Sequence, residues 1–327
     1  MMRIASYTSL GQDWKFRRGW SWITGIVLFL LTTVPWDIIA APIITIIDDD
    51  ARSVKAVRMV KAVADRCGIK VTFAAIAASL ERNPEMVDLL HQYVEEGHEV
   101  ASHSLTHSPE IWKAGDATDF QAIEHEVAEA EEVFSRLGFQ PKSFVYPYGN
   151  FSRKTRHGIF EIVGKYYPVA FNARGDINLP GKTYALYISR HPLRAHNSLF
   201  MMKLLIDEAV AADSSWIVIL THSANSDFSA EMLESIIRYA QESGAVFMPA
   251  SLAWQHVNSW PMMREGQIPD YSLVGDYVNA AYYHLPLLLG VGIALVVLCS
   301  VLIFLYVRLR FRKRWKVAYG RGDPPIH

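Results

Sequence analysis

The sequence predicts an α/β fold of the barrel type, and two observations carry this expectation. Between residues 42 and 258, short runs rich in β-branched and aromatic residues alternate with amphipathic stretches, as expected where crossover helices join parallel strands. Polar residues capable of metal binding or catalysis follow several of these runs, and a barrel of parallel strands collects its functional groups at the strand ends. One α/β barrel domain is therefore favoured over two separate domains.

The elements follow from local patterns. Asn83 precedes Pro84 and is expected to cap a helix, because its side chain accepts from free backbone amides. The expected strands are 43–47, 71–75, 99–102, 143–146, 169–171, 185–188, 216–220 and 246–248. The expected helices include 53–66, 84–96, 120–137, 199–212 and 230–243.

Two apolar segments flank this domain. Residues 19–41 follow a short, partly basic N-terminus, 1–18, and are expected to form a signal anchor or a signal peptide. Residues 285–307 carry no charge and are long enough to cross a hydrocarbon core of about 30 Å, which predicts a transmembrane helix. Residues 259–284, which contain Pro and Gly, are expected to link the domain to this helix.

The charge pattern predicts an orientation in a membrane. The tail 308–327 is strongly basic, and an excess of Lys and Arg beside a membrane segment indicates the cytoplasmic side. Basic residues also precede the first apolar segment, so both ends are expected inside and the domain 42–258 outside. The formal net charge is -1, which gives no basis for a nucleic-acid partner.

A hydrolytic metal site is predicted by two groups of side chains. Three carboxylates, Asp48 to Asp50, follow the apolar run 43–47, and His103 and His107 lie four residues apart. One Asp and two His supply ligands for a divalent ion such as zinc with a position left for water. Taken singly, such histidines are more typical of surface or packing positions, but their Ser and Thr neighbours favour ligation. Asp50 alone is interpreted as a helix N-cap.

Four short segments, in this order at successive expected strand ends, resemble the polysaccharide deacetylases of the NodB-homology carbohydrate esterase type. The resemblance extends from about residue 43 to residue 254. The segments are 46–50 (IIDDD), 102–107 (SHSLTH), 146–149 (YPYG) and 220–222 (LTH).

The resemblance implies a distorted (β/α) barrel of the deacetylase type. The N- and C-terminal membrane helices expected from the apolar segments would flank it. It also implies roles for the matching residues. Asp48 is expected to be the general base, Asp49, His103 and His107 the metal ligands, His222 the general acid, and the backbone N–H of Tyr148 a donor to the oxyanion.

Three departures from the family pattern affect these expectations. Asp50 stands where Gly usually follows the aspartate pair, and Val145 stands where an Arg usually orients the base. Arg190 is a candidate replacement, although a surface or structural role is the preferred interpretation. The usual aspartate–tryptophan motif has only a weak candidate in Asp176.

The expected function is a membrane-anchored polysaccharide N-deacetylase that acts outside the cytoplasm. The expected substrates are N-acetylglucosamine units of peptidoglycan or of an exopolysaccharide, and the expected cofactor is Zn²⁺, with Co²⁺, Ni²⁺ or Mn²⁺ as alternatives. The expected partners are the acetylated glycan and the membrane. Three alternatives remain open: an O-acetyl polysaccharide esterase, a hydrolase with an unrelated amide substrate, and a catalytically idle glycan-binding subunit of an envelope or export complex.

Overall fold

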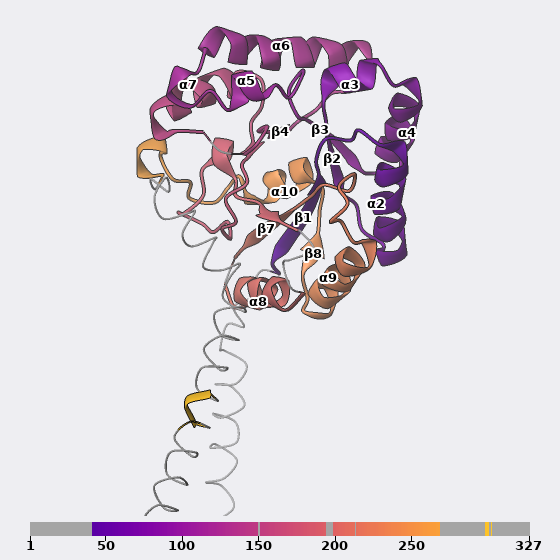
Figure 1. The fold of residues 1–327 in the computed structure, drawn as a ribbon, viewed down its shortest axis with the longest axis vertical. Helices are drawn as coiled ribbons and strands as arrows, with labels where there is room; N and C mark the ends of the chain where they lie inside the picture. Colours follow the sequence, from indigo (N-terminus) through magenta and orange to yellow (C-terminus); the bar gives the residue numbers. More distant parts are fainter. Residues whose placement is uncertain are drawn as a thin grey trace, which may run out of the picture. The chain divides into compact units, whose positions relative to one another are not determined.

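The computed structural model describes residues 41–149, 151–193, 199–212 and 214–268, together with 298–300 and 302. The chain divides into two compact units, of which the first, Met1–Ala40, lies outside the described residues. The second unit contains an eight-stranded sheet with helices packed around it (Figure 1).

The sheet has the strand order β5-β4-β3-β2-β1-β7-β6, with β8 added beside β1, and all pairings between its strands are parallel. In the described part of the chain β5 and β6 do not pair, so the predicted barrel is a curled half-barrel. The strands are β1 (Ile43–Asp48), β2 (Thr72–Ala75), β3 (Glu99–Ser102), β4 (Phe144–Val145), β5 (Ala170–Phe171), β6 (His191–Pro192), β7 (Trp216–Thr221) and β8 (Val246–Phe247).

The helices that were expected form with boundaries shifted by one or two residues. Asn83 caps α4 as predicted, since its side chain accepts from the backbone N–H of Met86. The helices are α2 (Val54–Cys67), α3 (Ala77–Glu81), α4 (Pro84–Glu95), α5 (Pro109–Trp112), α6 (Phe120–Arg136), α7 (Arg153–Val163), α8 (Leu199–Val210), α9 (Ala230–Glu242) and α10 (Ala250–Val257).

Two cores cover the two faces of β1. Ile44 and Ile46 belong to the core that the sheet forms with the outer helices, which include α2, α4, α6, α8 and α9. Ile47 belongs to the core that includes Ala253 and Val257 of α10. Side chains alternate between the faces of a strand, so each residue at the end of β1 is directed to one of these two sides. Helix α10 lies within the curve of the sheet, as Figure 1 shows.

Two local expectations are wrong. Residues 185–188 do not form a strand: Ala185–Tyr187 is a short 3₁₀ helix, and only Ile188 makes an isolated bridge, to Phe171. Asp50 does not cap a helix, because α2 begins at Val54 and the side chain of Ser53 accepts from the N–H of Ala56. The carboxylate of Asp50 is therefore available for another role.

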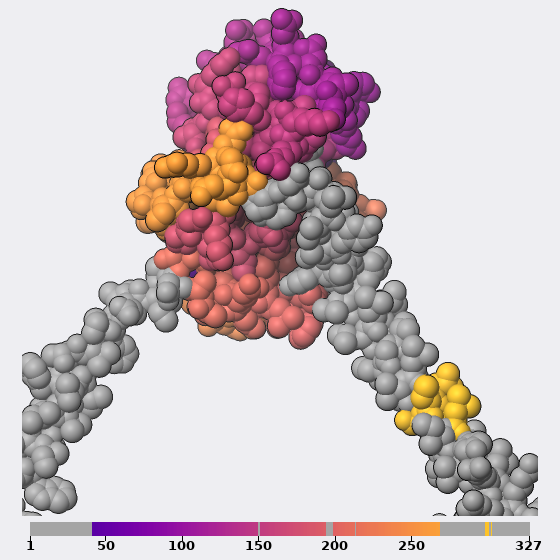
Figure 2. All heavy atoms as spheres, turned by 90° about the vertical axis from the view of Figure 1, so that its left-hand side faces the viewer, coloured from indigo at the N-terminus to yellow at the C-terminus, as the bar shows by residue number. Residues whose placement is uncertain are grey.

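The expected membrane segments lie almost wholly outside the described residues, and their structure is not described. Among the described residues, none of the helices is both long and apolar enough to cross a membrane. The beginning of the predicted linker is described: residues 261–268 pack on the domain, with Ile268 6% exposed. Figure 2 shows this orange stretch lying against the magenta and pink middle part of the chain.

Candidate metal centre and catalytic site

The predicted site residues meet at the carboxyl ends of neighbouring strands. Asp48 is the last residue of β1, and Asp49 and Asp50 follow it. His103 follows β3, and His222 follows β7. β1 lies between β2 and β7, and β3 lies on the far side of β2. Because all these strands are parallel, their carboxyl ends share one edge of the sheet. The topology thus brings together residues far apart in the sequence.

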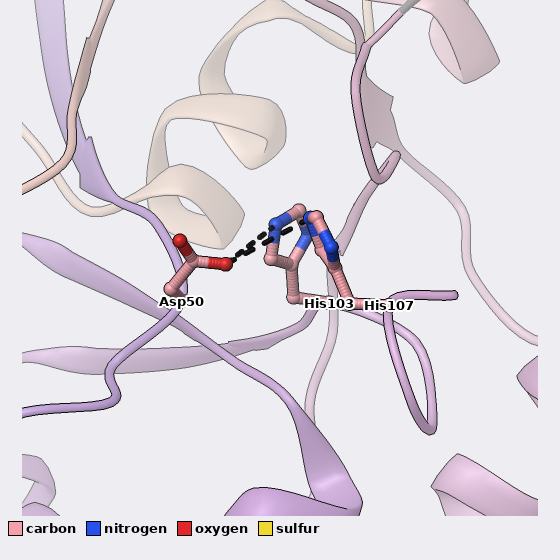
Figure 3. Close-up of side chains that lie close together, drawn as sticks. All are labelled: Asp50, His103 and His107. Atoms are coloured by element: carbon pink, nitrogen blue, oxygen red, sulfur yellow. Dashed lines mark ion pairs between the residues drawn. The ribbon is translucent and has the colours of Figure 1, made fainter. Parts of the chain in front are cut away.

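Asp50, His103 and His107 form the cluster with the geometry of a metal site. Oδ1 of Asp50 lies 3.8 Å from Nε2 of His103 and 3.7 Å from Nε2 of His107, and one ligand atom from each residue lies within 4.8 Å of the others. Figure 3 shows the carboxylate directed at both rings. Oδ1 of Asp50 is buried without a hydrogen-bond partner, and its ion pair with Nη2 of Arg52 is long, at 3.4 Å, so a bound cation would complete its contacts. These residues fit a divalent ion with nitrogen and oxygen ligands.

The two histidines have the protonation states that metal binding requires. The backbone carbonyl of Val145 lies 2.8 Å from Nδ1 of His103 and accepts its hydrogen, which leaves Nε2 with its lone pair toward Asp50. Burial lowers the pKa of His103 to about 4 and also lowers the pKa of His107. Both rings are therefore neutral at physiological pH, and neutral imidazole is the form that binds metals.

Asp49 lies beside this cluster and is held by Arg190. The guanidinium Nη1 donates to Oδ1 of Asp49 at 2.7 Å, and Nε donates to the carbonyl of Asn172 at 2.7 Å. Both Arg190 and Asp49 are almost fully buried. Burial by itself would raise the pKa of Asp49, but the charge of Arg190 holds that pKa below its ordinary value. Arg190 is thus not a surface residue: it orients a carboxylate at the site.

Asp48 is directed to different partners. Its Oδ1 accepts from the hydroxyl of Thr221 at 2.7 Å and from the N–H of Ser223 at 2.9 Å. Its Oδ2 accepts from the hydroxyl of Ser223 at 2.6 Å. Burial raises the pKa of Asp48 to about 7, although these hydrogen bonds oppose the rise.

The geometry favours roles shifted by one residue from those that the sequence resemblance implied. Alternation along β1 places Asp48 on the side of Ile44 and Ile46, and Asp49 on the side of Ile47, where Arg190 lies. The histidine cluster includes the carboxylate of Asp50. The expected roles of Asp48 as base and Asp49 as metal ligand stay predictions, and the contacts support Asp49 and Asp50 for these roles more directly.

His222 and Tyr148 border the same site. Nε2 of His222 lies 4.0 Å from Oδ2 of Asp49, and its side chain is 32% exposed. The ring centroids of Tyr148 and His107 lie 4.5 Å apart, and the hydroxyl of Tyr148 donates to the carbonyl of His107 at 3.2 Å. Within the described residues the backbone N–H of Tyr148 makes no hydrogen bond. This N–H is therefore free to donate, and the role toward an oxyanion that the resemblance implied stays a prediction.

Backbone conformation at this edge is unusual. All non-glycine residues with positive φ in the described part of the chain lie in the loops that carry the site residues. They are Asp50, Ala51, Ser104, His107 and Tyr148, with φ of 76°, 44°, 66°, 59° and 61°.

Glu126 of α6 supports the histidine loop, the segment from His103 to His107. Glu126 was not among the residues expected from the sequence. Its carboxylate accepts from the hydroxyl and the N–H of Thr106, which lies between the two histidines. It also accepts from the indole of Trp112 at 3.4 Å. Glu126 is 2% exposed and stands on the apolar face of its helix, between Ile123 and Ala130. A charged residue at that position of the helical repeat is the signal that could have revealed it.

A second group of potential ligands lies elsewhere, formed by Asp65, Glu96 and His98. The ammonium of Lys61 already lies 2.6 Å from both carboxylates. Nδ1 of His98 accepts from the backbone N–H of Val71, so the neutral ring carries its hydrogen on Nε2. Neither ring nitrogen then offers a lone pair, and we interpret this group as an ion-pair network around Lys61.

Comparisons with known proteins give one family match and a set of solved structures with a similar fold. Residues 41–161 match the family model described as polysaccharide deacetylase. None of the curated proteins matches this chain.

Solved structures with a similar fold include two proteins assigned as polysaccharide deacetylases. The protein from Mycobacterium smegmatis is 11% identical with a TM-score of 0.54, and the match covers 67% of this chain and 91% of that chain. The protein from Pseudomonas aeruginosa PAO1 is 17% identical with a TM-score of 0.51, covering 68% and 93%. The Xyl-CE4 domain of a multidomain xylanase from the hindgut metagenome of Trinervitermes trinervoides is 21% identical with a TM-score of 0.48, covering 67% and 92%.

Proposed function

We propose that the protein is a metal-dependent hydrolase that removes acetyl groups from an N-acetylated polysaccharide, because residues 41–161 match the family model described as polysaccharide deacetylase. The observation that carries the proposal is the cluster of Asp50, His103 and His107 next to Asp49, which Arg190 keeps oriented. These are the parts that hydrolysis of an acyl bond requires, and they lie at one edge of the sheet.

The proposed roles of the side chains follow from their positions. Asp50, His103 and His107 would hold the ion, which when bound supplies a Lewis acid for the acetyl carbonyl and lowers the pKa of a water molecule. Asp49, kept ionised by Arg190, accepts the proton of the attacking water.

Two further groups complete the reaction. The backbone N–H of Tyr148 donates to the oxyanion, and one such donor contributes about 3 kcal/mol at a transition state. His222, which lies 4.0 Å from Asp49 and is accessible from solvent, gives a proton to the departing amine.

The substrate, metal and location of the proposal come from the sequence. N-acetylglucosamine units of peptidoglycan or of an exopolysaccharide are the proposed substrates, and Zn²⁺ is the proposed ion. The apolar segments 19–41 and 285–307 and the basic tail 308–327 support a membrane-anchored protein with its domain outside the cytoplasm. The full chain should then stay with membranes after washing at alkaline pH, and a fragment of residues 42–268 should not.

Two alternatives differ in chemistry. An O-acetyl esterase would use the same groups, because an ester carbonyl is attacked in the same way. A catalytically idle glycan-binding subunit was motivated by Val145 at the position of the base-orienting Arg, by Asp50 and by the missing aspartate–tryptophan motif. The bond of Arg190 to Asp49 supports Arg190 in the base-orienting role, which weakens the first of these three arguments.

The test measures acetate release by the fragment 42–268 loaded with Zn²⁺. N-acetylglucosamine oligomers, peptidoglycan and an O-acetylated xylan would be compared, each with and without a chelator. Asp49→Asn and Asp50→Asn should abolish release, and Asp116→Asn, at an exposed site on the domain surface, should not. Release from the xylan alone would establish the esterase, and glycan binding without any release would establish the idle subunit.

A further inference from the structure

We propose that Asp48 is a positioning residue for His222 and that it does so by holding the two residues on either side of that histidine. The inference rests on the proposed function in one respect only, the role of His222 as proton donor. The carboxylate of Asp48 accepts three hydrogen bonds, all from the segment where β7 ends and the following loop begins. One comes from the hydroxyl of Thr221 and two come from Ser223. His222 is the residue between them.

The strand register explains why the contact forms. Asp48 pairs with Thr221 as the last residue pair between β1 and β7, and the N–H of Asp49 donates to the carbonyl of Thr221 at 2.9 Å. The backbone of β7 is thus fixed up to Thr221 and leaves the sheet there. Beyond that point the side chain of Asp48 continues the connection from β1 to Ser223, so that the loop has a second attachment directly after His222.

His222 has few contacts of its own. Its imidazole makes no hydrogen bond within the described residues, and its contact with an acidic group is the 4.0 Å approach to Oδ2 of Asp49. The position of this ring therefore depends on the backbone of residues 221–223. That backbone is held by a carboxylate that is 0% exposed.

The same contacts argue against Asp48 as the base. Oδ1 of Asp48 accepts two hydrogen bonds and Oδ2 accepts one. A carboxylate with these donors and no solvent exposure is not placed to take a proton from water. Asp49, by contrast, faces the histidine cluster with Oδ2, 3.9 Å from Nε2 of His103.

The two possible roles respond differently to an amide at position 48. In Asp48→Asn the amide oxygen still accepts from Thr221 and from the N–H of Ser223, and the NH₂ group donates to the hydroxyl of Ser223. An amide cannot act as a base. If Asp48 positions His222, this variant should keep activity within about tenfold of the wild type, whereas Asp49→Asn should be inactive.

Asp48→Leu removes the three contacts and keeps a side chain of similar size. With His222 displaced, hydrolysis of the N-acetylated glycan should fall by about 10²-fold or more, because an amine needs a proton donor to leave. Hydrolysis of an aryl acetate should change by less than about tenfold, because an aryloxide leaves without one. The affinity for Zn²⁺ should not change. Ser223→Ala, which removes one donor, gives a smaller change of the same kind if Asp48→Leu does not fold.

NMR of the histidine rings tests the positioning without activity. The ring resonances of His222 should shift in Asp48→Leu but not in Asp48→Asn, and those of His103 and His107 should stay in place in both. If the wild type released no acetate but these shifts occurred, the proposed function would fail and the positioning role would stand. Unchanged His222 resonances in Asp48→Leu, or an Asp48→Asn variant as inactive as Asp49→Asn, would overturn the inference.

Discussion

Arg190 contacts Asp49 across 141 residues of sequence. No local pattern links the two, which is why the sequence suggested a surface or structural Arg and found only Val145 at the expected position. The structure supplies the reason: Arg190 precedes β6, and β6 pairs with β7, which pairs with β1. The side chain then reaches Asp49 inside the curled sheet. A contact of this kind depends on the strand order, and a single sequence does not specify that order.

Replacing Arg190 should therefore change both catalysis and stability. In Arg190→Met the pKa of Asp49 should rise, because the neighbouring positive charge is lost. The acid limb of the pH profile of kcat/KM should move to higher pH, and kcat/KM at neutral pH should fall by about 10²-fold. The free energy of unfolding should fall by about 3–5 kcal/mol, since an unpaired charge stays buried. Arg190→Lys is the matched control with the charge kept, and an unchanged acid limb in Arg190→Met would contradict the role.

His98 should make the domain less stable in acid. Burial, with smaller contributions from Lys70 and Lys61, lowers the pKa of His98 to about 4. The unfolded chain thus binds a proton between its ordinary pKa of 6.5 and about pH 4, and the folded chain does not. The free energy of unfolding should accordingly fall as the pH drops through this window.

The measurement compares wild type and His98→Gln by urea unfolding across this range. The Gln oxygen can accept from the N–H of Val71, which keeps the hydrogen bond of Nδ1. Between these two pH values, the free energy of unfolding of His98→Gln should fall less than that of the wild type, by on the order of 1–2 kcal/mol. Parallel pH profiles for the two proteins would show that His98 does not titrate in this window.

At the scale of elements, the sequence predicted best those segments whose pattern is local. The long amphipathic helices were found because burial of one face imposes a period on them. The strands β1 and β7 were found as short, continuous apolar runs, because both of their faces are buried. The strand expected at 185–188 was wrong, and β6 was missed. β6 is a strand of two residues, His191 and Pro192, and its existence depends on its pairing with β7 rather than on its own residues.

The histidine loop is an element whose shape depends on a helix. Glu126 of α6 accepts two hydrogen bonds from Thr106, and the N–H of Leu105 donates to the carbonyl of Glu126. In Glu126→Ala the affinity for Zn²⁺ should fall by about 10–100-fold, as is typical when a group that orients metal ligands is lost. Titration calorimetry of the metal-free domain would measure this. Glu132→Ala, at an exposed position of the same helix, is the control, and equal affinities for both variants would exclude an orienting role.

At the scale of the whole molecule, the described domain extends further than the apolar and polar patterns suggested. The sequence placed residues 259–284 in a linker because of their Pro and Gly content. In the structure the N–H of Gly181 donates to the carbonyl of Pro261, and the N–H of Met263 donates to the carbonyl of Thr183. Linker composition thus did not reveal that the first residues of this stretch pack on the domain.

A fragment that ends at residue 268 should therefore be more stable than one that ends at residue 258. The longer fragment keeps the buried Ile268 and its carbonyl contact with Arg156, 3.4 Å away. Burial of one Ile side chain contributes about 1.5–3 kcal/mol, and the difference between the fragments should be at least that large in urea unfolding. Ile268→Ala in the longer fragment should reproduce part of the loss. Two fragments of equal stability would show that residues 261–268 contribute nothing.

The left-handed residues around the site have a consequence for directed evolution. A non-glycine residue in this conformation costs about 1–2 kcal/mol, and Asp50, His107 and Tyr148 are at the same time proposed to bind the ion or the oxyanion. A screen for heat resistance alone would therefore reward glycine at these positions and discard the side chains that react. Variants selected jointly for residual activity should instead accumulate changes on the outer helices, and the left-handed residues should remain as they are.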